Sequence, residues 1–240
     1  MNINKVAVAT ITWARDAQEE QLLRASLQYL AKLEIPVFIT DGGSNSSFLR
    51  FLAEFPHFQV SQAATKGVWA QARSSLQAAY QSGAAFILYT EPDKQNFFQH
   101  ALPRFIAAAP EHDPVGVVLA ARSEAGFATF PTFQRTTETT INQCCAEIMG
   151  HPIDYTYGPF LLNRNLVPYL SLVQEDIGWG WRPYTFGVAH RLNYEVTYSV
   201  EDFACPEEQR EDTPLERIYR MRQLSQNIQG LVLSTSVKLS

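Results

Sequence analysis

Cysteine is scarce in this chain of 240 residues: Cys144 and Cys145 are adjacent, and Cys205 lies far from them. An adjacent pair with one distant residue matches neither the ligand spacing of a zinc site nor the disulfide framework of a secreted protein. Long uncharged apolar runs are also missing, and the first apolar stretch soon meets Arg15 and Asp16. We therefore expect reduced thiols in a soluble, cytoplasmic protein without a signal peptide or a transmembrane segment.

An excess of positive charge is missing as well. The formal net charge is −5 and the pI is about 5.6, so the chain lacks the basic surface that nucleic-acid binding requires. Apolar residues, in contrast, make up 46% of the sequence, which is ample for a packed core. The length suits one large α/β domain or two small ones, and the lack of a linker or internal repeat favours one. The oligomeric state stays open, and a homo-oligomer is compatible with the sequence.

Familiar glycine motifs are absent too. Neither GxGxxG nor GxxxxGK[ST] occurs, which argues against a dinucleotide-binding Rossmann site and a P-loop. The GxSxG motif is also missing, which argues against an α/β-hydrolase.

Alternating apolar strands and helices fill the first hundred residues. The patterns predict strands at 5–11, 35–40, 58–60 and 85–90, with amphipathic helices between them, and this order is typical of a parallel, right-handed α/β sheet. Farther along, the sequence predicts a strand at 115–121, a helix at 137–149 and a long final helix at 215–231.

Polar side chains follow several of these strands. Thr10, Thr12 and Arg15 follow the first, Asp41 the second, and Glu91 and Asp93 the fourth. Because ligands of open parallel sheets bind beyond the carboxyl ends of the strands, we expect a ligand site there. Glu91 and Asp93 point to the same side of an extended chain stiffened by Pro92, and two hard oxygen donors suit a divalent cation carrying a phosphate. The alternative is a solvated corner between strand and helix.

The ordered set of motifs resembles a known family. The strand ending in TDGGS, followed by TKGVWAQARSSLQAAYQSGAAFILYTEPDK, is similar to the nucleotide-sugar-dependent glycosyltransferases of the GT-A fold, family-2-like group. The resemblance covers residues 5–95 in good order and is looser through residue 195. It implies a single α/β domain of GT-A type over 1–240, with a mostly parallel central sheet flanked by helices. Its Rossmann-like half, about 1–95, would bind the nucleotide sugar, and about 96–240 would form the acceptor side with the C-terminal helix.

The resemblance also implies roles in donor binding. Thr10 would lie by the nucleotide, and Asp41 would hydrogen-bond the base or ribose. Arg73, with Lys66 as a second candidate, would lie near the base and phosphates. Glu91 and Asp93 stand where the family has Asp-x-Asp and would bind Mg²⁺ or Mn²⁺, Asp93 being the preferred ligand. The structural alternatives are a turn stabiliser for Asp41 and solvated surface charges for Lys66 and Arg73.

Three residues of the second half complete the predicted site. Glu175 and Asp176 resemble an acceptor-side acidic pair, whose acid is the general base of inverting members; the alternative is an acidic pair favoured at a helix N-terminus. His190 falls where GT-A enzymes place a further metal ligand, although a lone histidine in an apolar segment is commonly structural.

The predicted activity is transfer of a sugar, most readily a hexose, from a nucleoside diphosphate sugar to a small-molecule, glycan or lipid-linked acceptor. The alternatives are a nucleotidyltransferase and a non-catalytic binding protein on a degenerate GT-A fold.

Overall fold

The computed structural model describes residues 1–210 and 212–239. Its contacts divide the chain into two compact units. The first unit comprises Met1–Glu111 and Pro159–Val167, and the second comprises His112–Gly158 and Pro168–Ser240. The predicted single domain over 1–240 stays a prediction.

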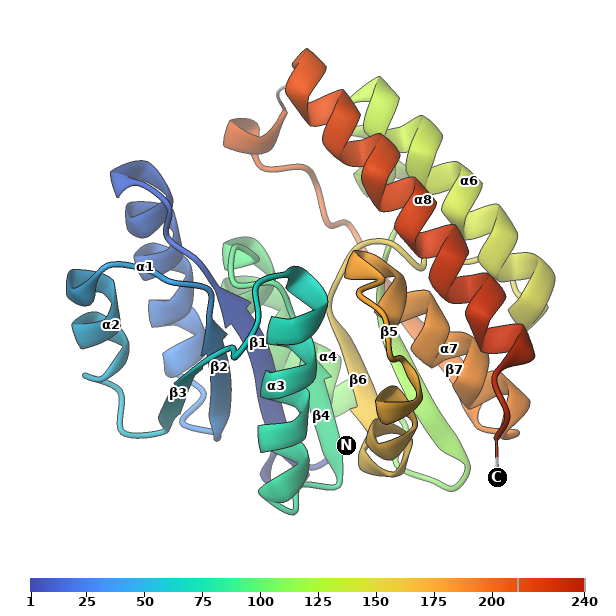
Figure 1. Cartoon of the computed structure of the whole chain (residues 1–240), viewed down its shortest axis with the longest axis horizontal. Coiled ribbons are helices and arrows are strands. Elements are labelled where there is room, and N and C mark those ends of the chain that lie inside the picture. Colours follow the sequence, from blue (N-terminus) through green and yellow to red (C-terminus); the bar gives the residue numbers. More distant parts are fainter. Residues whose placement is uncertain (211, 240) are drawn as a thin grey trace. The chain divides into compact units, whose positions relative to one another are not determined.

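The first unit is built on a mostly parallel sheet (Figure 1). Its strands β1 (Val6–Thr12), β2 (Val37–Asp41), β3 (Phe58–Gln62) and β4 (Phe86–Tyr89) run parallel in the order β3-β2-β1-β4. Strand β6 (Phe160–Asn163) joins β4 in the antiparallel direction. Strands β1, β2 and β4 are buried along their whole length, which is why they read as continuous apolar runs.

The helices of the first unit form where caps and apolar spacing coincide. Helix α1 (Ala17–Ala31) starts at Asp16, whose side chain accepts a hydrogen bond from the backbone N–H of Glu19. Helix α3 (Val68–Gln81) starts after Gly67, whose φ of 125° favours glycine, and it packs against β1, β2 and β4. The remaining helical elements are the 3-10 turn Ile3–Lys5, α2 (Ser46–Leu52), the π-helical turn Phe97–Ala101 and α4 (Leu102–Ala108).

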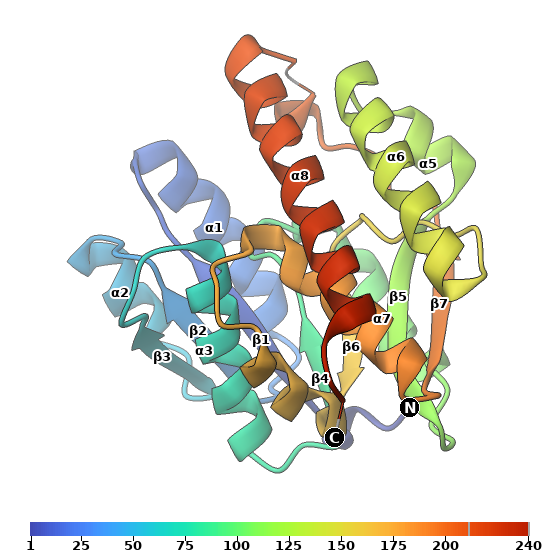
Figure 2. The ribbon, with the colours of Figure 1, turned by 45° about the vertical axis from the view of Figure 1, so that its right-hand side comes forward.

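The second unit pairs β5 (Val115–Arg122) with β7 (Glu195–Glu201) in parallel. Its main helices are α5 (Glu124–Ala128), α6 (Thr132–Met149), α7 (Trp181–Arg191) and α8 (Pro214–Ser236), with 3-10 turns at Gly178–Gly180 and Glu207–Gln209. The 3-10 segment Arg164–Leu172 begins in the first unit and ends in the second. Helix α8 packs along α6 and α7, as Figures 1 and 2 show. Its Gly230 touches the backbone of Gly180, and a Cβ atom there would overlap with the Gly180 carbonyl, so this crossing requires glycine.

The predicted α/β class and mostly parallel sheet are confirmed, and each predicted strand is present. Helix α6 starts five residues before its predicted start at residue 137, and α8 extends past both predicted ends. The sequence patterns missed β6, β7 and α7. Strand β6 has only four residues, and every side chain of β7 is at least partly exposed, so neither carries a strong apolar signal.

No helix among the described residues is long and apolar enough to span a membrane. Cys144, Cys145 and Cys205 are free cysteines. Burial raises the pKa of Cys145 to about 12, so this thiol stays protonated at neutral pH.

Candidate functional site

The carboxyl ends of three neighbouring strands define the candidate donor site in the first unit. Strand β1 lies between β2 and β4, and the chain passes from β1 to β2 on one side and reaches β4 on the other. This is a topological switch point, where open α/β sheets form a ligand crevice. The registers align Thr12 with Asp41 and Ala9 with Tyr89, so the loops that follow these strands leave the same edge of the sheet.

Asp41 ends β2 and is 1% exposed. Its Oδ1 atom accepts hydrogen bonds from the backbone N–H groups of Gly43 at 2.8 Å and Ser44 at 2.7 Å. Its Oδ2 atom accepts from the hydroxyls of Thr12 at 2.8 Å and Ser44 at 2.6 Å. Four hydrogen-bond donors therefore surround the carboxylate. Asp41 stabilises the turn after β2, which is the structural role predicted from the sequence as an alternative to ligand binding. Its direct contact with a base or ribose stays a prediction.

Thr10 is completely buried in β1. Its hydroxyl donates to the carbonyl of Thr90 at 2.8 Å, which ties β1 to the chain just after β4. This bond positions the segment that carries Glu91 and Asp93. The predicted proximity of Thr10 to the nucleotide is untested.

Glu91 and Asp93 follow β4 and are half-buried. The described residues contain no group of three or more His, Cys, Asp or Glu side chains arranged to hold a metal ion. Two carboxylates are nevertheless a sufficient protein contribution for Mg²⁺ or Mn²⁺ when substrate phosphates and water supply the other oxygens. The donor set therefore fits a cation that arrives with a diphosphate.

The two predicted cationic residues of the donor side are exposed. Lys66 precedes α3, and Arg73 lies on α3 with its guanidinium 6.0 Å from the ring centroid of Trp69. Sequence reasoning overlooked two other residues nearby, the exposed Trp13 after β1 and the buried Gln71 in the first turn of α3. A tryptophan directly after a buried strand was the available signal.

Glu175, Asp176 and His190 belong to the second unit, and all three are exposed. The Oδ1 atom of Asp176 accepts a hydrogen bond from the backbone N–H of Gly178 at 2.9 Å, which shapes the turn before α7. His190 lies in the last turn of α7. Their predicted roles as base and metal ligand stay predictions.

The second unit also contains a buried ionic cluster that the sequence did not reveal. Arg122, at the end of β5, donates to Asp154 at 2.7 Å, to Glu138 at 2.7 Å and to the Thr156 hydroxyl at 2.8 Å. The rings of Phe127 and Phe130 lie 4.6 and 4.5 Å from its guanidinium carbon. The cluster therefore joins β5, α5, α6 and the loop that carries Asp154.

The cluster shifts the pKa values of its charged members. Burial opposes the charge of Arg122, but Glu138 and Asp154 outweigh it and raise the pKa of the guanidinium. Burial alone would raise the pKa of Asp154, whereas the charge and hydrogen bonds of Arg122 hold that pKa well below its usual value.

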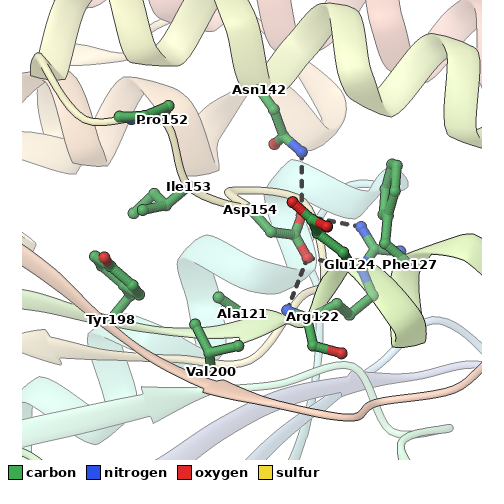
Figure 3. A pocket seen from close by; sticks show the side chains of 11 residues that line it. Ala121, Arg122, Glu124, Phe127, Asn142, Pro152, Ile153, Asp154, Tyr198 and Val200 are labelled. Atoms are coloured by element: carbon green, nitrogen blue, oxygen red, sulfur yellow. Dashed lines mark hydrogen bonds and ion pairs between the residues drawn. The ribbon is translucent and has the colours of Figure 1, made fainter.

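An open cleft of about 360 Å³ lies beside this cluster (Figure 3). Asp154 and Asn142 form its polar wall and are hydrogen-bonded to each other. Tyr198 and Val200 of β7 form an apolar wall. Because the Arg122 charge is matched by two carboxylates, the cleft offers no free cation for an anionic ligand.

No protein-family model and no curated protein matches the sequence. Solved structures do match. Glucosyl-3-phosphoglycerate synthase from Mycobacterium tuberculosis, in complex with Mn²⁺, UDP and phosphoglyceric acid, is 14% identical with a TM-score of 0.66, covering 98% of this chain and 80% of that one. The same protein in complex with UDP is 12% identical with a TM-score of 0.69, covering 98% of this chain and 81% of that one. A structure described as a mycobacterial protein is 16% identical with a TM-score of 0.67, covering 98% and 76%. The chain thus has the GT-A-type fold that the motif order implied.

Proposed function

We propose that this protein is a glycosyltransferase that transfers a hexose from a nucleoside diphosphate sugar to a small acceptor. The observation that carries the proposal is the convergence of three polar loops at one edge of the sheet, after β1, β2 and β4. One loop is fixed by Asp41, and another carries the carboxylates Glu91 and Asp93. Sheets of this kind bind nucleotides at such a switch point.

The similar solved structures support this assignment by what they bind. Glucosyl-3-phosphoglycerate synthase was solved with Mn²⁺, UDP-glucose and phosphoglyceric acid. That protein is 12% identical to this chain, so we take the substrate class from it and leave the individual sugar and acceptor open.

We assign Asp93, assisted by Glu91, to hold a divalent cation. When bound, the cation supplies Lewis-acid stabilisation of the diphosphate as the bond between sugar and phosphate breaks. The residues of this chain hold and orient the donor: Lys66 and Arg73 offer positive charge on the α3 side, and Asp41 fixes the loop after β2. His190 is the candidate for a further ligand.

The donor-side proposal is tested by Asp93→Asn. We expect Mn²⁺-dependent binding of UDP to weaken at least about tenfold, since losing even an outer partner of a metal ligand commonly costs that much. The thermal melt of the free protein should not change. Calorimetry with UDP, GDP, ADP and dTDP sugars, with and without Mn²⁺, measures the effect, and Glu54→Gln, an exposed carboxylate of the same unit, is the control. Equal Mn²⁺-dependent binding in Asp93→Asn would remove its metal role.

The acceptor side is assigned to Asp176, with Glu175 as its neighbour. If the anomeric configuration is inverted, a base must take the acceptor proton, and Asp176→Asn should lower turnover about 10²–10⁴-fold with little change in donor affinity. Proton NMR of the product reads the stereochemistry. A retained anomer with near-normal turnover in Asp176→Asn would reject the base.

A nucleotidyltransferase remains the second enzymatic candidate, because it also uses an α/β sheet and metal-binding carboxylates. The products separate the two reactions: sugar transfer releases a nucleoside diphosphate, whereas nucleotidyl transfer from a triphosphate releases pyrophosphate. A protein that binds the nucleotide sugar without turnover would be the non-catalytic alternative.

A further inference from the structure

The turn that carries Asp176 is held by a side chain of another helix. Asp176 is exposed, and its Oδ1 atom accepts a hydrogen bond from the backbone N–H of Gly178 at 2.9 Å. The next backbone N–H, that of Trp179, donates at 3.2 Å to Oε1 of Gln226, which lies on α8, 47 residues later in the chain. Two adjacent peptide groups are therefore fixed by two side chains, one from the turn itself and one from α8.

Helix α8 lies directly against this turn. A Cβ atom on Gly180 would overlap with the carbonyl oxygen of Gln226, and one on Gly230 would overlap with the carbonyl oxygen of Gly180. The backbones of the turn and of α8 thus touch, with no side chain between them at these glycines. This close approach fixes where along the turn the Gln226 carboxamide lies.

Gly178 leaves the space that the Gln226 carboxamide occupies. A Cβ atom at this position would overlap with the carboxamide, and the φ of 49° lies in the left-handed region that favours glycine. Glycine also restricts its own backbone less than any other residue does. A turn centred on Gly178 therefore needs a restraint from outside, and Gln226 supplies one by fixing the peptide group that follows Gly178.

The side chain of Trp179 is bound to the same helix. Its Nε1 atom donates to the hydroxyl of Tyr219 at 2.9 Å, and that hydroxyl accepts from Nε2 of Gln223 at 3.2 Å. Tyr219 and Gln223 both belong to α8. These bonds are exposed, whereas the bond to Gln226 is partly buried and competes less with water, so Gln226 is the stronger restraint on the turn.

We propose that Gln226 is a positioning residue for Asp176: its carboxamide oxygen fixes the turn from which the Asp176 carboxylate takes the acceptor proton. This inference rests on the proposed function and adds to it a residue that acts through the base. Because the bond to Gly178 uses Oδ1, the proton is expected on Oδ2 of Asp176.

Steady-state kinetics of Gln226→Leu test the proposal, since leucine is similar in size to glutamine and has no acceptor oxygen. The assay measures nucleoside diphosphate released from UDP, GDP, ADP and dTDP sugars with Mn²⁺, with glycerol, glucose and phosphoglyceric acid as trial acceptors. We expect kcat to fall about 10- to 100-fold, because a small misplacement of a reacting group can cost that much. The KM for the donor and the affinity for UDP should not change. Gln226→Glu keeps an acceptor oxygen and should restore most of the turnover.

A double variant tests whether Gln226 acts through Asp176. Where Asp176→Asn has already removed the base, adding Gln226→Leu should lower kcat by no more than about twofold. Gln229→Leu removes an exposed glutamine from the same helix and is the control that should leave kcat unchanged. Hydrogen–deuterium exchange of segment 175–181 should be faster in Gln226→Leu than in the wild type and should slow again in Gln226→Glu.

The outcomes separate this inference from the proposed function. If the wild-type protein releases nucleoside diphosphate from none of these donors, the proposed function fails, and this inference fails with it. If the wild type turns over and Gln226→Leu has the same kcat, positioning is overturned while the proposed function stands, even if the thermal melt of the variant is lower. An equal loss of kcat with and without Asp176→Asn would also overturn it, because Gln226 would then act independently of Asp176.

Discussion

Two buried clusters, one in each unit, satisfy their charges in different ways. In the first unit, the Asp41 carboxylate is surrounded by neutral donors: two backbone N–H groups and the hydroxyls of Thr12 and Ser44. In the second unit, Arg122 is bound by the carboxylates of Glu138 and Asp154 and enclosed by aromatic rings. Both groups are almost completely buried.

The two clusters have different structural roles: one shapes a single loop, and the other joins segments that are distant in the sequence. The donors to Asp41 lie within three residues of it or on the adjacent strand, so that cluster fixes one loop at the candidate donor edge. The partners of Arg122 lie 16 and 32 residues away, so that cluster fixes tertiary structure. We therefore expect damage to the Arg122 cluster to affect mainly stability, and damage to the Asp41 cluster to affect mainly the donor loop.

The largest expected effect is a loss of unfolding free energy when the Arg122 cluster is damaged. Asp154→Asn leaves the buried guanidinium with one fewer negative partner, and breaking a buried ion pair costs about 3–5 kcal/mol of unfolding free energy. Urea denaturation followed by circular dichroism measures the loss. Asp212→Asn, in the exposed pair with Arg217, is the control and should leave the denaturation midpoint unchanged.

Replacing all three charged side chains sharpens this result. Arg122→Met combined with Glu138→Leu and Asp154→Leu removes the guanidinium and both of its carboxylates together, and apolar replacement of a whole buried ionic cluster is often neutral. The triple variant should therefore be more stable than the sum of the three single losses implies. Additive losses would show that the three residues do not act as one cluster.

Lowering the pH should reduce the contribution of the same cluster to the unfolding free energy, by less than Asp154→Asn does and over a defined pH range. The pKa of Asp154 is lower in the folded protein than the ordinary value of about 3.9 in an unfolded chain. Its contribution to stability is therefore complete at neutral pH and is lost as the pH falls below about 4 towards the folded pKa. The unfolding free energy, measured from pH 7 to pH 3, should fall more steeply in wild type than in Asp154→Asn. Parallel curves would contradict the shifted pKa.

The sequence predicted the parts of the fold that depend on local pattern. Buried parallel strands read as apolar runs, because this signal arises from neighbouring residues. The Arg122 cluster was invisible, because residues 122, 138 and 154 are brought together only by tertiary structure. TDGGS identified Asp41 as important but left two roles open, since a turn stabiliser and a ligand contact use the same residue type.

The smallest expected change in stability follows from substituting Asp41. This substitution tests whether a carboxylate that is surrounded by neutral donors can be replaced by a neutral side chain at little cost. In Asp41→Asn the amide oxygen can still accept from the N–H groups of Gly43 and Ser44. The amide NH₂ can donate to the hydroxyl oxygens of Thr12 and Ser44, because a hydroxyl can accept as well as donate. The unfolding free energy should therefore fall by only about 0.5–1.5 kcal/mol, the worth of a typical hydrogen bond.

Asp41→Ala should cost more than Asp41→Asn, because it leaves two backbone N–H groups and two hydroxyls at this turn without their acceptor. Both variants are compared by urea denaturation and by UDP calorimetry. If Asp41 acts through the loop, Asp41→Asn should retain most of the affinity for UDP and Asp41→Ala should lose it, in the same order as the stability losses. If Asp41→Asn instead lost UDP affinity while keeping its stability, Asp41 would contact the nucleotide directly, and the neutral cluster would be part of the binding surface as well as its support.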